Sequence, residues 1–114
     1  MKKPKLLNLI QVFAFIMLLL SIFMSIEAKS TEHIVEMTTH RFIPSKITIK
    51  RGDSIKFVNK STNFHNVVVE KLKIRTKLIK NGQFLVIKPD QVGVFSYYCQ
   101  PHRSMGMVGE VTIE

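Results

Sequence analysis

Cysteine, histidine and methionine side chains in this chain have the types and the spacing of a soft-metal site. The only cysteine, Cys99, is followed three positions later by His102, and His65 stands 34 positions before it. One thiolate, two imidazoles and a weakly bound thioether make up the ligand set of a blue-copper electron-transfer site. Met105 and Met107 both follow His102, and spacing alone does not choose the axial ligand between them. The residues therefore predict one type 1 copper ion.

Two neighbours of these residues have expected roles around the metal. Asn66 directly follows His65, where its amide can tie the two ligand segments together by hydrogen bonds. The alternative for Asn66 is a simple turn or strand-start residue. Pro101 lies between Cys99 and His102 and has no N–H, so it cannot donate a hydrogen bond to the thiolate. We expect the missing hydrogen bond to lower the reduction potential.

The single thiol supports the predicted copper site, and the remaining histidines do not extend it. A single cysteine cannot form an internal disulfide, and in an oxidising compartment an unpaired thiol is a liability unless something occupies it. A buried, inert Cys99 is the alternative, but the neighbouring His102 favours a metal ligand. His33 and His40 have no partners at ligand spacing, and we expect both on the surface.

The N-terminal segment has the composition of a secretory leader. Three lysines, at positions 2, 3 and 5, precede an uncharged, largely apolar run over residues 6–26. This pattern predicts a signal peptide over residues 1–28, cleaved after Ala28, with the folded domain over residues 29–114. The alternative is an uncleaved membrane anchor, because the run is long enough to span a bilayer. Both interpretations place residues 29–114 outside the cytoplasm, in the periplasm or an equivalent compartment.

The folded part is strongly basic. The whole chain has a formal net charge of +9, and removal of residues 1–28 leaves 14 basic and 7 acidic groups, or +7. A basic surface favours acidic partners or anionic membranes. Nucleic acid is not expected, because the chain is predicted to be exported and does not interleave aromatic with basic residues.

Short apolar–polar alternations separated by turns predict an all-β fold. Such stretches favour a β-sandwich or barrel, and no segment of the folded part has a convincing helical period with caps. Cys99 is expected to end a strand, with residues 100–106 forming the loop to the last strand. The predicted strands are 33–38, 46–50, 54–59, 65–70, 83–88, 92–98 and 109–114.

Basic residues occupy every second position between 71 and 77. In an extended chain they would lie on one face, with the apolar residues between them on the other. The stripe is either a solvated edge strand whose charges prevent aggregation or a docking surface for an acidic partner; the segment can also be a loop. Its members are Lys71, Lys73, Arg75 and Lys77.

The chain resembles the cupredoxins, in particular the small plastocyanin and pseudoazurin type. The segments Tyr98–His102 and Met105–Val111 resemble the copper loop of that group, and Phe64–Val68 resembles its upstream histidine motif. The resemblance covers about residues 36–114. It implies a cupredoxin-like Greek-key β-sandwich with copper near one end.

Residue by residue, the resemblance implies four copper ligands: His65, Cys99, His102 and Met107. Met107 is preferred because the spacing Cys-x2-His-x4-Met of the family places the axial ligand there. In the family the electron leaves through the exposed edge of the second histidine. Pro101, Met105 and Phe64 are then expected to form an apolar rim around His102. The basic segment 71–80 departs from the acidic or neutral segment of many plastocyanins.

Two functions fit these residues. The first is an extracytoplasmic electron carrier that cycles between Cu(II) and Cu(I). We expect it to be a monomer that binds redox proteins, which can be acidic, near His102. It would contact a membrane only if the leader is uncleaved. The alternative is a periplasmic copper-binding or delivery protein with copper as cargo, which the lack of a methionine-rich stretch disfavours. An enzyme is not expected, because further copper centres need histidines beyond the spare His33 and His40.

Overall fold

The computed structural model describes residues 8–24 and 29–114. In the N-terminal range it contains one helix, α1 (Leu9–Met24). Asn8 and Gln11 cap its start reciprocally: Asn8 Oδ1 accepts the Gln11 N–H at 2.9 Å, and Gln11 Oε1 accepts the Asn8 N–H at 3.2 Å. No helix within the described ranges is long and apolar enough to cross a membrane. The cleavage position predicted after Ala28 lies outside the described residues.

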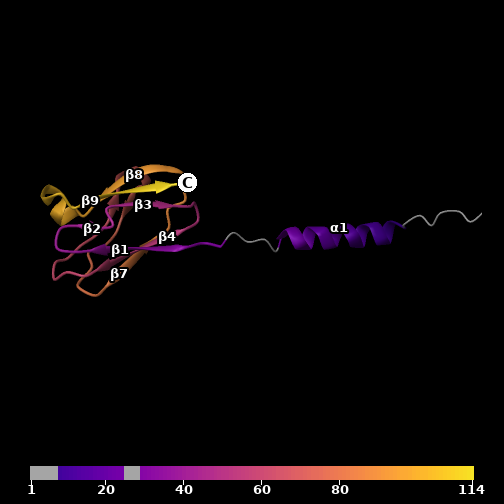
Figure 1. The fold of residues 1–114 in the computed structure, drawn as a ribbon, viewed down its shortest axis with the longest axis horizontal. Coiled ribbons are helices and arrows are strands. Elements are labelled where there is room, and N and C mark those ends of the chain that lie inside the picture. Colours follow the sequence, from indigo (N-terminus) through magenta and orange to yellow (C-terminus); the bar gives the residue numbers. More distant parts are fainter. Residues whose placement is uncertain (1–7, 25–28) are drawn as a thin grey trace, which may run out of the picture.

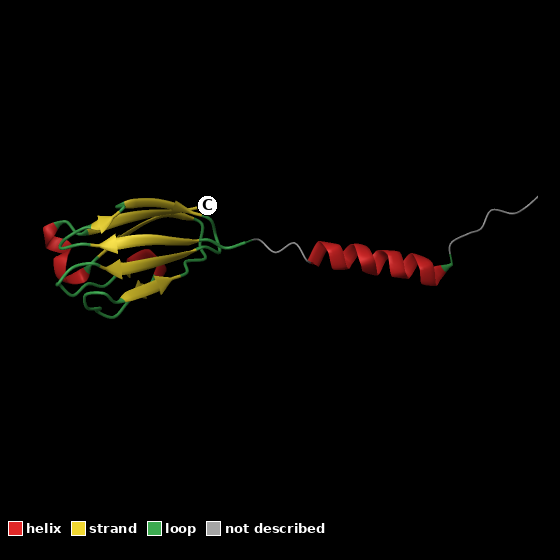
Figure 2. Ribbon diagram, turned by 60° about the horizontal axis from the view of Figure 1, so that its bottom comes forward, coloured by secondary structure: helices red, strands yellow, loops and turns green. Residues whose placement is uncertain are grey.

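Residues 29–114 form two β-sheets that face each other (Figures 1 and 2). One sheet has the strand order β2-β1-β4-β7, and the other has the order β3-β9-β8-β5-β6. The predicted all-β, cupredoxin-like sandwich is confirmed. The strands are β1 (Glu32–Met37), β2 (Phe42–Ile43), β3 (Lys46–Ile49), β4 (Ser54–Asn59), β5 (Val68–Val69), β6 (Ile74–Arg75), β7 (Phe84–Ile87), β8 (Gly93–Tyr98) and β9 (Val108–Ile113).

The core lies between the sheets and follows from the period-2 alternation of the strands. In β4, Ile55 and Phe57 are fully buried while Lys56 and Val58 are only half-buried. Phe57 packs edge-to-face against Phe42 from β2 and Tyr97 from β8, with ring centroids 5.9 and 5.5 Å away. Such edge-to-face pairs add to the stabilisation from buried area. This aromatic cluster joins the two sheets.

Three loops meet at one pole of the sandwich. β1 and β4 are parallel, so both end at this pole, and the Lys60 N–H donates to the Met37 carbonyl at 2.9 Å. β8 ends there too, and the 3-10 helix η2 (Gln100–Met105) leads from it to β9; it is the gold coil at the end of the sandwich in Figure 1. The loops 38–41, 60–67 and 99–107 therefore come together in space.

The structure settles the conformation of the basic segment, which the sequence left open, and corrects one expected strand. Residues 71–77 are not one extended strand: η1 (Glu70–Leu72) is a 3-10 helix, and Lys73 has a left-handed backbone with φ of 56°. Only Ile74–Arg75 pairs, as the edge strand β6. Of the predicted strand 65–70, only Val68–Val69 belongs to a sheet, because His65 makes a separate bridge with Ile79.

Candidate metal centre

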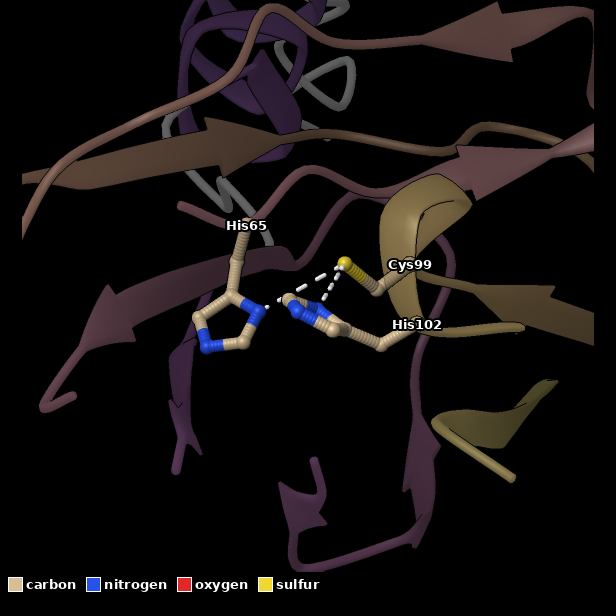
Figure 3. Close-up of side chains that lie close together, drawn as sticks. All are labelled: His65, Cys99 and His102. Atoms are coloured by element: carbon tan, nitrogen blue, oxygen red, sulfur yellow. Dashed lines mark hydrogen bonds between the residues drawn. The ribbon is translucent and has the colours of Figure 1, made fainter. Parts of the chain in front are cut away.

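Three candidate ligand atoms meet at the pole where the loops converge. The Cys99 sulfur lies 3.5 Å from Nδ1 of His65 and 3.5 Å from Nδ1 of His102 (Figure 3). All three atoms lie within 4.8 Å of one another. Cys99 and His65 are fully buried, whereas His102 is half-buried. One sulfur and two imidazole nitrogens thus face a common centre, with an open side at His102.

Backbone hydrogen bonds close the loop that carries Cys99. The Cys99 N–H donates to the Met107 carbonyl at 3.1 Å, and the Met107 N–H donates to the His102 carbonyl at 3.2 Å. Pro101 lies in the first turn of η2, where the missing N–H costs no helical hydrogen bond. Gly106 ends η2 with a φ of 83°, a left-handed conformation that glycine adopts without strain. The loop therefore holds Cys99, His102 and Met107 in a fixed relation.

His65 reaches the centre from a different loop, 34 positions upstream. Its backbone is paired with Ile79: the Ile79 N–H donates to the His65 carbonyl at 2.8 Å, and the His65 N–H donates to the Ile79 carbonyl at 3.2 Å. The Nε2 atom lies 2.7 Å from the hydroxyl of Ser61, a buried residue. With Nε2 bound in this way, Nδ1 faces Cys99.

The two candidate axial methionines differ sharply in burial. Met107 is 0% exposed, whereas Met105 is 59% exposed at the end of η2. A thioether that serves as a weak ligand at a buried centre must itself be buried. Burial therefore favours Met107, while Met105 lies on the surface together with exposed Phe64 and Pro101.

Asn66 joins the two segments that carry the candidate ligands. Its side-chain Oδ1 accepts the Gln100 N–H at 2.8 Å, which connects the residue after His65 to the residue after Cys99. Its Nδ2 donates weakly to the Thr76 carbonyl at 3.5 Å. Asn66 is buried, so these hydrogen bonds are shielded from water. A side-chain amide therefore links the two segments that carry the candidate ligands.

The electrostatics of the centre suit a cation. Burial lowers the pKa of His65, and the nearby His102 and His40 lower it further, while the Thr38 carbonyl opposes the shift. Burial and the charge of His40 also lower the pKa of His102. Both imidazoles are therefore neutral at neutral pH, with a lone pair free to bind a metal.

The thiol needs a positive partner to ionise. Burial raises the pKa of Cys99, although backbone N–H groups of Asn66 and His102 partly oppose this effect. A metal cation supplies the missing compensation and displaces the thiol proton. Neutral imidazoles, a buried thiol and a buried thioether are soft ligands of the kind that copper prefers, so the residues present fit this metal.

Sequence reasoning missed two contacts of this centre. His40 was expected on the surface without a partner, but it is half-buried and its ring centroid lies 5.0 Å from that of His102. His33 was also expected on the surface; it lies at the opposite pole, half-buried, and bonds Asp53 through Nε2 at 2.9 Å. The Ser61 hydroxyl beside His65 was not foreseen. The pattern Ser-x3-His was the only available signal, and such spacing is common in loops.

Comparisons with known proteins agree with this chemistry. The family described as copper binding proteins, plastocyanin/azurin family, matches residues 29–114. Plastocyanin from Prochlorothrix hollandica is 33% identical over 93 residues, covering 70% of this chain and 71% of that protein. Plastocyanin from Synechococcus sp. (strain JA-2-3B'a(2-13)) is 32% identical over 110 residues, covering 80% of this chain and 79% of that protein.

Solved structures show the same fold. A reduced mutant of amicyanin superposes with a TM-score of 0.67 at 24% identity, covering 77% of this chain and 87% of that one. Oxidised plastocyanin from Dryopteris crassirhizoma gives a TM-score of 0.63 at 22% identity, covering 71% of this chain and 99% of that one. The sulfur and imidazole donors at one pole, the sandwich and these relatives agree: the chain belongs to the plastocyanin/azurin family of copper binding proteins.

Proposed function

We propose that this protein carries single electrons through one copper ion held by His65, Cys99, His102 and Met107. The observation that carries the proposal is the buried group of Cys99 Sγ and two imidazole Nδ1 atoms within 4.8 Å of one another. When bound, copper supplies a one-electron couple between Cu(II) and Cu(I). As a small type 1 cupredoxin, the protein is an electron carrier and not an enzyme.

The surrounding residues keep the donors in place in both oxidation states. Cys99 and Met107 are tied through their backbones, His65 is bridged to Ile79, and Asn66 connects the two segments. A donor set that barely moves needs little reorganisation when an electron arrives or leaves. The dry, packed environment of fully buried Cys99 and Met107 also keeps water away from the thiolate.

Electrons reach the centre through His102, which we propose as the contact point for a partner. It is the only half-buried residue of the three donors, and exposed Phe64, Pro101 and Met105 supply an apolar rim. Cupredoxins exchange electrons with redox partner proteins. We further propose that the protein works as a monomer outside the cytoplasm, in the periplasm or an equivalent compartment, after removal of residues 1–28.

We propose that the partner has an acidic surface. Lys71, Lys73 and Lys77 are exposed, and the Arg75 guanidinium donates to the side chain of Gln100, two residues before His102. The basic stripe therefore borders the loop from which the electron leaves. One member of the stripe, Arg75, lies on the edge strand β6, where a charge can also prevent strand pairing, so an experiment must separate the two roles.

The proposed ligand set is tested by adding Cu(II) to the purified protein and to its Cys99→Ser variant. Wild-type protein should show an intense thiolate-to-copper band and a narrow EPR hyperfine pattern, both lost on reduction. Cys99→Ser should lose the band, and Met105→Leu should keep it. A pale wild-type complex with an ordinary tetragonal EPR signal would contradict the electron-carrier site and favour copper storage or delivery.

The docking proposal is tested with charged small oxidants in place of the partner. Lys71→Glu/Lys77→Glu should slow oxidation of the reduced protein by anionic hexacyanoferrate(III) severalfold at low salt, because positive charges near the exit steer anions. The effect should fade at an ionic strength of about 0.5 M, where screening is short-ranged. The matched control, Arg51→Glu/Lys88→Glu, changes the same net charge beside Asp53 at the opposite pole. Equal slowing by both variants would show an effect of net charge alone, which would contradict the docking proposal and favour protection of the sheet edge.

A further inference from the structure

We propose that Ser61 is a positioning residue that sets the tautomer of His65 and aims its Nδ1 lone pair at the metal centre. The inference rests on the proposed function, since it assigns the lone pair to copper. Ser61 lies four positions before His65, and its Oγ is 2.7 Å from Nε2. Both residues are buried, and Nδ1 of the same ring is 3.5 Å from the Cys99 sulfur.

Which of Ser61 and His65 donates the hydrogen bond between them follows from Asn59, at the end of β4. The Asn59 Nδ2 donates to the Asn63 carbonyl at 2.7 Å and to the Ile79 carbonyl at 3.0 Å. Carbonyls only accept, so the amide nitrogen must face them. Its Oδ1 then faces Ser61 and accepts the Ser61 N–H at 2.9 Å and the Ser61 hydroxyl at 3.1 Å.

The Ser61 hydroxyl has one proton and two pure acceptors beside it, Asn59 Oδ1 at 3.1 Å and the Asn63 carbonyl at 3.4 Å. We assign the proton to the nearer one, Asn59 Oδ1. The Ser61 oxygen can accept two hydrogen bonds, and the Asn63 N–H supplies one at 3.2 Å. With the hydroxyl proton on Asn59, the remaining lone pair faces His65 Nε2, which then carries a proton to complete the bond. Because a neutral imidazole has a single N–H, Nδ1 is left with its lone pair directed toward Cys99.

The anchor of this chain of hydrogen bonds is rigid. Asn59 is fully buried, its N–H donates to the Gln83 carbonyl at 2.9 Å, and its carbonyl accepts the Gly82 N–H at 2.8 Å. Ile79, which receives the Asn59 amide, also bridges the His65 backbone. The orientation of the His65 ring is thus fixed by the end of β4, and not only by the metal.

The wild-type copper-free protein provides the first test, without any substitution. Nitrogen-15 chemical shifts of the His65 ring at neutral pH should show a protonated Nε2 and an unprotonated Nδ1. The opposite tautomer would overturn the proposal directly. This measurement does not involve copper. If it shows the opposite tautomer while the copper-loaded protein still shows the thiolate-to-copper band, the Ser61 proposal is wrong and the proposed function stands.

Substitutions then test whether the Ser61 hydroxyl is responsible. Ser61→Ala should mix the two tautomers, lower Cu(II) affinity by about 10–100-fold, as for other residues that orient a ligand, and shift the reduction potential. Ser61→Thr keeps the hydroxyl and should restore all three readouts, while Thr62→Ala, at an exposed neighbour, should change none. The Thr38 carbonyl also bonds the His65 ring. If Ser61→Ala keeps the wild-type tautomer and affinity, that carbonyl suffices and the proposal is wrong.

Discussion

At the scale of single residues, the proposed site is a set of soft donors that burial keeps uncharged when no metal is bound. The pKa of the Cys99 thiol is raised by burial, and the pKa values of both imidazoles are lowered by burial. The metal-free site therefore holds neutral groups. Copper binding replaces the thiol proton with a cation, which couples metal affinity to the stability of the fold.

The assignment of the axial ligand yields a prediction at this scale. Met107→Leu should keep copper bound but raise the reduction potential, because loss of a weak donor disfavours Cu(II) more than Cu(I). Each tenfold loss of Cu(II) affinity relative to Cu(I) raises the potential of a one-electron couple by about 59 mV. Protein-film voltammetry measures the shift.

Met105→Leu is the matched control for this substitution. Met105 is exposed and Met107 is fully buried, so the same change at position 105 should leave the potential unaltered. A shift produced by Met105→Leu and not by Met107→Leu would reverse the assignment.

At the scale of elements, the pairing of β8 with β9 positions the copper loop between them. Tyr97 pairs with Gly109 across these antiparallel strands. A Cβ at Gly109 would overlap Cζ of Tyr97, closer than any van der Waals contact. The Tyr97 hydroxyl is buried without a hydrogen-bond partner among the described residues, and burial raises the pKa of this phenol. Gly109 thus makes room for a large side chain in the core.

Gly109→Ala should destabilise the fold, because the new methyl group has no space beside Tyr97. Overpacking of this kind costs about 1–3 kcal/mol in the free energy of unfolding, which urea denaturation measures. In a Tyr97→Leu background the same substitution should cost less, since the ring carbons that it meets are gone. An equal cost in both backgrounds would show that the Tyr97 ring is not the obstacle.

At the scale of the whole molecule, the two poles of the sandwich differ in role: one carries the candidate metal centre, and the other stabilises the fold. The second pole is tied by Asp53, which is buried at the start of β4. Asp53 Oδ1 accepts the Thr31 N–H at 2.9 Å, and Oδ2 accepts the Lys50 N–H at 3.0 Å. Oδ2 also lies 2.9 Å from His33 Nε2. One carboxylate therefore fastens the starts of β1 and β4 to the end of β3.

These hydrogen bonds, that of His33 first, lower the pKa of Asp53 to about 2. The stabilisation is present above the pKa of an unfolded aspartate, about 3.9, and is lost as the pH falls through about 2. Asp53→Asn should lower the thermal midpoint at pH 7, because an amide group replaces one accepting oxygen. The difference from wild type should narrow as the pH falls from about 4 toward 2.

Asp90→Asn is the control, since Asp90 is an exposed aspartate in the loop after β7. Thermal unfolding followed by circular dichroism between pH 2 and pH 7 compares the three proteins. If Asp53→Asn and wild type differ by the same amount at every pH, the carboxylate charge at position 53 does not stabilise the fold.

The sequence by itself determined the fold class and the chemistry of the site. Alternation over residues 54–59 predicts β4 with its bounds, because burial on one face of a strand imposes a period of two. The spacing of Cys99 and His102 limits them to one short loop, and soft donors in such a loop indicate copper. Neither inference needs to know which residues meet across the chain.

Only the tertiary structure decided the features that depend on contacts between distant segments. Burial separates Met107 from Met105, and His40 lies beside His102. The 3-10 helix η1 decides against a single extended strand over residues 71–77, which the sequence left open between a strand and a loop. The hydrogen bonds that connect Asn59 through Ser61 to His65 depend on Ile79, which accepts the Asn59 amide and is bridged to the His65 backbone. Local patterns cannot predict such contacts, because they arise when parallel β1 and β4 and the end of β8 bring three loops to one pole.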